Sequence, residues 1–290
     1  MKVTLFYNEA AGEGTTADEL TRIVERHGHR VVEVVSTNDD VARLKDTPAD
    51  LVVASGGDGT VSTAARVLAR QGIPLAILPH GTANNIARSL GIHETTDEAV
   101  AAWAKAERRP LDLGRASGPW GERRFIEAVG GGLIARSISA FEQQPSDDDR
   151  PKREELIDAV RMHAEVLTNL KPTVWEMTLD GVPVSGEYLL VAVLNIPFIG
   201  PNLELCPHAD PTDGAFSVVM AGESHREAIA QHLQHRVADR DVGLGVQCVH
   251  ARCVEIERGD LLHIDDEVFT WPAEARVSIE IEPASLDILV

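Results

Sequence analysis

Leu51-Val52-Val53-Ala54-Ser55-Gly56-Gly57-Asp58-Gly59-Thr60 is the stretch that decides the fold. Its continuous apolar, β-branched first half predicts a buried strand. A turn dense in glycine follows directly, and apolar residues then recur at the spacing of one helix face, at Val61, Ala64, Ala65 and Leu68. The stretch therefore predicts a strand, a tight turn and, after Thr60, a helix.

The glycines make this turn a candidate anion-binding site. They permit positive φ angles and leave no Cβ to block a ligand, and backbone N–H groups at the start of the helix would point at an anion. Asp58 would repel a phosphate unless a divalent cation or a hydroxyl lay between them, so we interpret it as metal-linked or hydroxyl-linked. The spacing is neither that of a Walker A loop nor that of the dinucleotide fingerprint, and a tight turn without a ligand is the alternative.

A second unit of the same kind follows. Residues 73–78 predict another strand, Pro79-His80-Gly81-Thr82-Ala83-Asn84-Asn85 another small polar turn, and residues 86–90 another helix, which ends before Gly91. Two successive strand–turn–helix units place both turns at the same edge of a parallel sheet, which is the edge where open α/β sheets bind ligands.

These two motifs, in this order, resemble the diacylglycerol kinase catalytic-domain family, which includes bacterial soluble lipid kinases and the sphingosine and ceramide kinases. The resemblance covers nearly the whole chain. It implies an ATP- and Mg²⁺-dependent kinase that phosphorylates the hydroxyl of a diacylglycerol-like or sphingoid lipid. It also implies a set of nucleotide-binding residues, namely Asn8, Gly12, Gly56, Gly57, Asp58, Gly59, Thr60, Gly81, Thr82, Asn84 and Asn85.

The chain changes character near Gly114. Strands and helices alternate as far as Pro110, which indicates an α/β domain with a parallel sheet. Strands dominate afterwards, among them Thr173–Leu179 and Val246–Glu257, with Asp180-Gly181 as a hairpin turn. The resemblance adds that residues 1–113 form a Rossmann-like nucleotide domain to which residues 283–290 return. Residues 114–282 would form a β-sandwich with helical insertions on the lipid-substrate side.

Two acidic segments in the second half complete the candidate site. Asp213 precedes a strand and resembles an aspartate that helps to hold a structural magnesium in relatives, a role that suits a carboxylate beside carbonyl-rich backbone. Asp265-Asp266-Glu267 resembles the Asp-Gly-Glu segment of the family. That resemblance makes Asp265 the candidate general base and Glu267 its partner on the nucleotide side.

Four residues depart from the family pattern: Glu9 replaces a proline, Glu13 a basic residue, Asn85 an aspartate and Asp266 a glycine. These departures leave room for a non-enzymatic nucleotide- or lipid-binding regulator. An NAD kinase-like phosphotransferase is the other alternative, because it shares Gly-Gly-Asp-Gly-Thr, whereas residues 82–91 resemble the lipid kinases.

The composition of the chain limits the classes of molecule that it is expected to bind. The net charge of −19 argues against nucleic acid and general adhesion to anionic membranes. Contact with the lipid substrate at a membrane surface would be peripheral and transient, and a homodimer stays open. Three cysteines cannot all pair within the chain, which favours a cytoplasmic, reducing location, and we interpret Cys248 and Cys253 as packing residues. The start of the chain predicts a strand rather than a signal peptide.

Overall fold

The computed structural model describes residues 1–9, 16–143, 151–238, 240, 242–270, 272 and 275–290. The chain divides into two compact units: unit 1 comprises residues 1–113 and 283–290, and unit 2 comprises residues 114–282. Two strands, β5 (Arg108–Gly118) and β18 (Val277–Leu289), run from one unit into the other along the chain. Gly12 of the predicted nucleotide-binding set lies outside the described residues.

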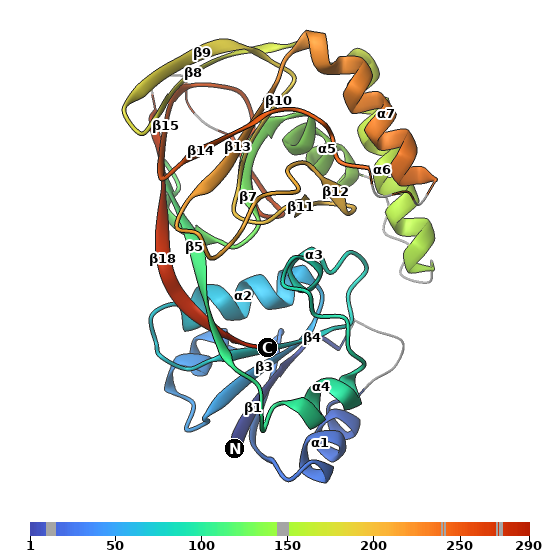
Figure 1. Ribbon diagram of the computed structural model, residues 1–290, viewed down its shortest axis with the longest axis vertical. Helices are drawn as coiled ribbons and strands as arrows, with labels where there is room; N and C mark the ends of the chain where they lie inside the picture. Colours follow the sequence, from blue (N-terminus) through green and yellow to red (C-terminus); the bar gives the residue numbers. More distant parts are fainter. Residues whose placement is uncertain (10–15, 144–150, 239, 241, 271, 273–274) are drawn as a thin grey trace. The chain divides into compact units, whose positions relative to one another are not determined.

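Unit 1 is an α/β unit with a parallel sheet (Figure 1). The strand order is β2-β1-β3-β4-β18, and every neighbouring pair is parallel. The strands of this unit are β1 (Lys2–Tyr7), β2 (Arg30–Ser36), β3 (Leu51–Gly56) and β4 (Leu75–Pro79), with the end of β18. The helices are α1 (Ala17–Arg26), the 3₁₀ helix η1 (Val41–Asp46), α2 (Asp58–Leu68), α3 (Asn85–Ser89) and α4 (Thr96–Ala102).

Helices cover both faces of this sheet, which explains why every residue of β3 is buried. On one face, Val53 and its neighbours form a core with Leu20 and Val24 of α1 and Val100 of α4. Helix α2 packs against β1, β3 and β4, and η1 packs against α2. A strand with helices on both sides needs apolar side chains in both directions, hence the unbroken apolar run that marked β3 in the sequence.

Unit 2 is a β-sandwich with helices on one side. Its first sheet has the order β14-β13-β10-β7-β16-β17, and β15, β8, β9 and the first part of β18 belong to the second sheet. The strands are β6 (Gly121–Phe125), β7 (Ala128–Gly132), β8 (Thr173–Leu179), β9 (Val182–Tyr188), β10 (Leu190–Leu194), β11 (Phe198–Ile199), β12 (Leu203–Glu204), β13 (Phe216–Ala221), β14 (Cys248–Ala251), β15 (Cys253–Arg258), β16 (Leu262–Ile264) and β17 (Glu267–Phe269). The helices are α5 (Leu133–Phe141), α6 (Lys152–Asn169), the 3₁₀ helix η2 (Glu223–His225) and α7 (Arg226–Val237).

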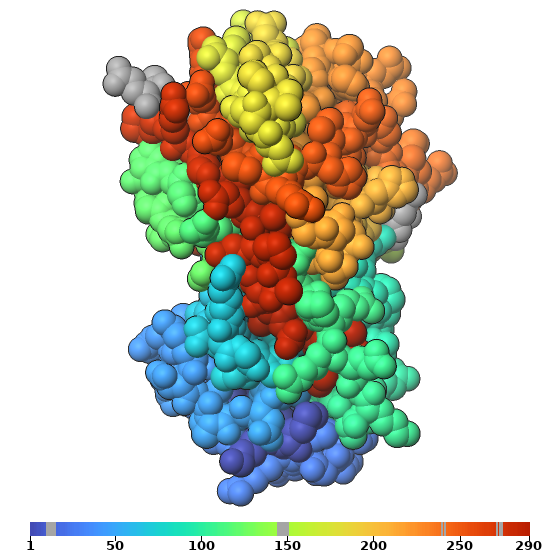
Figure 2. All heavy atoms as spheres, turned by 60° about the vertical axis from the view of Figure 1, so that its left-hand side comes forward, coloured from blue at the N-terminus to red at the C-terminus, as the bar shows by residue number. Residues whose placement is uncertain are grey.

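The first sheet of unit 2 is buried on both faces. Val191 and Val193 of β10 join Trp175 of β8 in the core between the sheets. Leu190 and Ala192 of the same strand join side chains of α5, α6 and α7 in a second core. By contrast, β9 alternates between exposed and half-buried residues and lies on the surface in Figure 2. The predicted fold class, a Rossmann-like α/β domain followed by a β-sandwich, is confirmed.

The hairpin predicted at Asp180-Gly181 joins β8 to β9, and both residues have positive φ angles, 48° and 81°. The Asp180 carboxylate also accepts hydrogen bonds from the backbone N–H groups of Arg252 and Cys253. This contact lies at the point where the chain leaves β14 for β15. The single strand predicted over Val246–Glu257 was therefore wrong, because these residues form two strands in different sheets.

The cysteines were also only partly understood from the sequence. Cys206 and Cys248 form a disulfide, so the interpretation of Cys248 as a packing residue was incomplete. Cys253 is free and half-buried, and burial raises the pKa of its thiol. Among the described residues, no helix is long and apolar enough to cross a membrane.

Candidate active site

The ends of three parallel strands bring most of the predicted nucleotide-binding residues to one edge of the unit 1 sheet. Asn8 follows β1, the Gly56–Thr60 turn follows β3, and the Gly81–Asn85 turn follows β4. The Asn8 N–H donates to the Ser55 carbonyl at 3.1 Å, and the His80 N–H donates to the Gly56 carbonyl at 2.9 Å. These bonds continue the sheet pairing one residue beyond the strands and fix where each turn starts.

The two glycine-rich turns touch through their backbones. A Cβ on Gly57 would lie 3.1 Å from the Gly81 Cα, which is tighter than most real contacts. A Cβ on Gly81 would overlap the Gly57 Cα outright. Both positions therefore need glycine because the turns approach each other, and not only because a ligand approaches them.

Helix α2 begins earlier than the sequence indicated. Its first residue is Asp58 and its N-cap is Gly57, so Gly59 and Thr60 belong to the first turn of the helix and not to the loop. The first backbone N–H groups of a helix lack partners within the helix and carry its positive dipole end. The glycine-rich turn is thus itself a helix N-terminus, which suits it to an anion such as a phosphate.

Asp58 and Asn84 shape the turns. An Asp58 carboxylate oxygen accepts a hydrogen bond from the Ile86 N–H at 2.9 Å, which ties the start of α2 to the start of α3. Asn84 has a φ of 52°, and its side-chain amide accepts from the Gly81 N–H and donates to the Gly81 carbonyl. The sequence analysis assigned Asp58 to a metal or a hydroxyl and missed its bond to the backbone.

The remaining predicted residues of this edge differ in their exposure. Thr60 is 5% exposed and Asn85 is 1% exposed, so both side chains support the turns from inside. Thr82 is half-buried. Within α2, the Thr63 hydroxyl donates a hydrogen bond to the Gly59 carbonyl at 2.8 Å. This edge therefore presents chiefly backbone groups, together with the half-buried Thr82.

Glu9, one of the departures from the family pattern, has a clear local partner. The Tyr7 hydroxyl donates to the Glu9 carboxylate at 2.7 Å. This hydrogen bond is the main cause of a raised pKa of Tyr7, since deprotonation would bring a phenolate against a carboxylate. Glu9 is thus hydrogen-bonded to the last residue of β1, the strand that it follows.

In unit 2, Asp265 lies in the hairpin turn between β16 and β17 and is 5% exposed. Its carboxylate accepts from the Glu127 N–H at 2.9 Å and from the N–H groups of Ile126 and Ala128 at 3.4 Å. Its own N–H donates to the Ala128 carbonyl at 2.8 Å, and its φ is 49°. Asp265 therefore anchors the turn to the segment that leads into β7.

His263 holds the same turn from the other side. Its Nδ1 lies 2.9 Å from the Asp265 carbonyl oxygen, so Nδ1 is the protonated nitrogen and donates. The side chain is fully buried, and burial lowers the pKa of His263 to about 4. The imidazole is therefore neutral at pH 7. His163 of α6, also buried with a pKa lowered to about 4 by burial, interacts electrostatically with it.

Glu267 has a different environment. It is the first residue of β17 and is exposed, two residues after the buried Asp265. Asp265, by contrast, is 5% exposed and accepts hydrogen bonds from backbone N–H groups. The two members of the predicted catalytic pair thus divide into an anchored carboxylate and an accessible one.

Asp213 does not gather further metal ligands in the structure. It is exposed, and its carboxylate accepts from the Ala215 N–H at 2.9 Å, which closes a turn before β13. Among the described residues, no three His, Cys, Asp or Glu side chains are placed to hold a metal ion together. The role of Asp213 in holding a structural magnesium stays a prediction.

The sequence analysis missed the partners of the Asp265 turn. It did not predict that the ring of His263 holds the turn. It also passed over Asn195, whose side-chain amide donates to the Ile126 carbonyl at 3.0 Å and whose N–H donates to the Glu127 carbonyl. One signal in the sequence could have indicated these partners. His263 stands two residues before the acidic turn, on a strand too short to need a polar residue in the core.

Comparisons with known proteins agree with both halves of the chain. The family model of the diacylglycerol kinase catalytic domain matches residues 2–116, and that of the YegS C-terminal NAD kinase beta sandwich-like domain matches residues 140–290. A diacylglycerol kinase from Mycobacterium tuberculosis is 30% identical over 305 aligned residues, which cover 99% of this chain and 94% of that protein.

Two further proteins are similar to this one. A diacylglycerol kinase from Bacillus subtilis is 29% identical over 177 residues, which cover 59% of this chain and 54% of that protein. The crystal structure of a diacylglycerol kinase from Bacillus anthracis matches with a TM-score of 0.74 and 20% identity, over 99% of this chain and 96% of that one. This last likeness concerns the fold.

The contact between the two turns predicts unequal effects of two glycine substitutions. Gly81→Ala forces the turns apart, whereas Gly57→Ala needs only a small shift. The Ile86 N–H donates a hydrogen bond to the Asp58 carboxylate. In Gly81→Ala this N–H should exchange with deuterium roughly tenfold faster than in wild type, which corresponds to a loss of about 1.4 kcal/mol of local stability. Hydrogen exchange resolved to single residues measures this. Equal protection of Ile86 in both variants would contradict the proposed backbone contact.

The neutral histidines predict a pH dependence. Because the folded pKa of His163 and of His263 lies near 4, below the unfolded value of 6.5, the unfolded chain binds more protons between these values. The stabilisation is complete above pH 6.5 and falls as the pH drops, by up to about 1.4 kcal/mol per pH unit for each histidine. Urea unfolding of His263→Asn, whose amide can still donate, should show a shallower loss than wild type between pH 6.5 and 5. Parallel curves would refute the assignment for His263.

Proposed function

Because the chain belongs to the diacylglycerol kinase family, and is therefore a kinase that transfers phosphate to a lipid alcohol, we propose that ATP with Mg²⁺ is the donor. We further propose that the acceptor is the hydroxyl of a diacylglycerol-like or sphingoid lipid. The name of the Mycobacterium tuberculosis relative makes diacylglycerol the first acceptor to test. The observation that carries the proposal is the joined pair of glycine turns at the carboxyl edge of the unit 1 sheet, with the N-terminus of α2 in one of them.

The phosphates suit this edge because it offers backbone donors without bulk. Gly57 and Gly81 let the two turns lie against each other, and α2 directs its first N–H groups and its dipole to the same edge. Thr82 adds a hydroxyl from the second turn. When bound, ATP supplies the γ-phosphoryl group and Mg²⁺ neutralises the charge that develops on it. A magnesium ion carried by nucleotide phosphates needs only one or two protein carboxylates, so it does not require a protein-made cage.

In unit 2, the contacts favour an exchange of the two predicted roles. Glu267, exposed at the start of β17, is proposed to accept the proton of the attacking lipid hydroxyl. Asp265 is proposed to position it, since its carboxylate ties the turn to the N–H groups of residues 126–128. The rigid hairpin then sets the direction of the Glu267 side chain two residues later.

The test is transfer of label from γ-labelled ATP, with Mg²⁺, to lipids in mixed micelles. The panel contains diacylglycerol, monoacylglycerol, phosphatidylglycerol, sphingosine and ceramide, with NAD as a soluble acceptor. We expect label in at least one lipid and none in NAD. Label in NAD alone would turn the proposal into an NAD kinase. ATP binding without transfer to any acceptor would favour a nucleotide-binding regulator.

The two carboxylates are separated by a matched pair of variants. Glu267→Gln should lower the transfer rate by roughly 10² to 10⁴-fold, the usual contribution of a general base, without changing the unfolding midpoint. Asp265→Asn should lower the free energy of unfolding by about 1–3 kcal/mol, because its NH₂ group cannot accept from a backbone N–H. Glu165→Gln, an exposed position on α6, is the control. Loss of transfer in Asp265→Asn at unchanged stability, with an active Glu267→Gln, would return the base to Asp265.

A further inference from the structure

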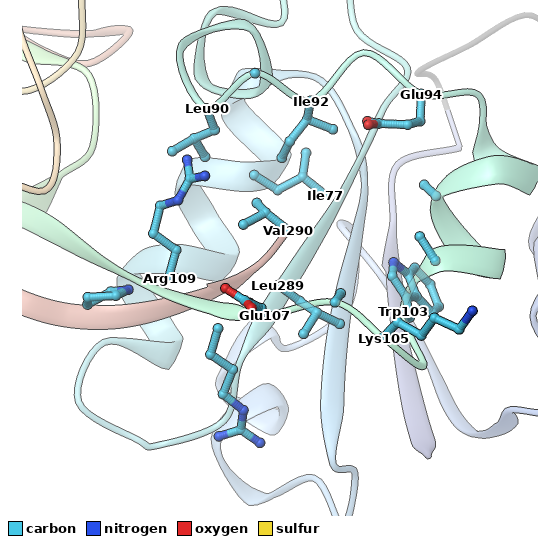
Figure 3. Close-up of a pocket in the computed structure, with 16 residues that line it drawn as sticks. Ile77, Leu90, Ile92, Glu94, Trp103, Lys105, Glu107, Arg109, Leu289 and Val290 are labelled. Atoms are coloured by element: carbon cyan, nitrogen blue, oxygen red, sulfur yellow. The ribbon is translucent and has the colours of Figure 1, made fainter.

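Unit 1 contains a pocket of about 460 Å³ that the proposed reaction does not use (Figure 3). It is lined by part of β4, the segment after α3, helix α4 with the residues that follow it, the start of β5 and the last residues of the chain. None of the described residues assigned to the nucleotide lines it. Its volume lies within the range of roughly 300–1,000 Å³ that is typical of small-molecule sites.

Part of the pocket wall is apolar. Leu90, Ile92, Ile77 and Val290 gather around the same space in Figure 3. Their neighbours on the wall include small residues such as Ala99 and Ala102 of α4, which leave the space open. An apolar wall of this kind gains free energy by covering hydrocarbon, at about 25 cal/mol per Å² removed from water.

The rim carries three cations, two of which form no salt bridge with a described residue. Lys105, Arg108 and Arg109 all line the pocket, with the carboxylates of Glu94 and Glu107. Arg108 lies 4.0 Å from the Asp287 carboxylate, whereas Lys105 and Arg109 form no salt bridge with any described residue, and both are exposed. In Figure 3, Arg109 lies beside Leu90, and Glu94 lies on the far side of Ile92. Two such cations beside a partly apolar pocket are notable in a chain of net charge −19.

We propose that this pocket binds an anionic amphiphile with a single hydrocarbon chain, whose chain packs on Ile77 and Leu90 and whose head group pairs with Arg109 and Lys105. A neutral apolar ligand would leave the cations unused, and a free phosphate would leave the apolar part of the wall wet. A guanidinium binds carboxylate and phosphate alike through paired N–H groups, so the shared feature is a negative head on an apolar chain. The small volume favours one chain over two.

The binding measurement uses the full chain and does not depend on kinase activity. Dodecyl phosphate and dodecanoate, below their micelle concentrations, are titrated by calorimetry beside dodecanol and inorganic phosphate. We expect one site per chain for an anionic amphiphile, with affinity at least tenfold above that for dodecanol and no heat from inorganic phosphate. The two head groups distinguish a phosphate source from a carboxylate source. Equal affinity for dodecanol would overturn the role of the cations.

Variants place the site. Arg109→Glu should weaken binding about tenfold or more, the value expected when a hydrogen bond to a charged group is lost. Arg22→Glu, an exposed arginine of α1 that does not line the pocket, carries the same charge change as a control. Ala102→Phe should block the pocket, and an unchanged melting temperature confirms that it is folded. Binding that survives both Arg109→Glu and Ala102→Phe would place the amphiphile elsewhere and refute the proposal. Loss in the variants with retained lipid kinase activity would support it independently of the proposed function.

Discussion

The approach of Gly57 to Gly81 is the constraint on which the carboxyl edge of the unit 1 sheet depends. Parallel pairing of β3 with β4 brings Gly56 opposite Pro79, so the two turns leave the sheet side by side. Side chains at either glycine would separate them. Asp58 and Asn84 then hold the contact, one through the Ile86 N–H and the other through the backbone of Gly81. The polar residues of the motif therefore act on the shape of the turns.

Unit 1 could be predicted well because its signals are local. A buried parallel strand needs an apolar run, a tight strand-to-helix turn needs glycine, and both requirements are met within Leu51–Thr60. Even there the start of α2 was predicted too late, because three glycines within four residues are typical of a loop, although Gly57 serves as the N-cap. Local pattern predicts which element comes next more securely than where its first hydrogen bond lies.

The site in unit 2 could be predicted only in part because its contacts are remote in the chain. Asp265 meets N–H groups that lie more than 130 residues earlier, and no local pattern announces such partners. Cys206 and Cys248 are 42 residues apart in the sequence, and Asp180 and Arg252 are 72 residues apart. The acidic turn itself was found, since its residues are contiguous. The different environments of Asp265 and Glu267 could not be predicted, because they depend on tertiary partners that bury one carboxylate and leave the other exposed.

The proposed roles of Asp265 and Glu267 follow from the contacts that each carboxylate makes. A general base must release and regain a proton at each turnover, which requires that neither state be strongly preferred by fixed neighbours. Asp265 accepts hydrogen bonds from backbone N–H groups, and these bonds hold the turn. Glu267 has no such burial to maintain, and it begins a strand whose position Asp265 and His263 already secure. In the proposed mechanism, the anchored Asp265 carboxylate therefore gives the accessible Glu267 side chain a fixed starting point.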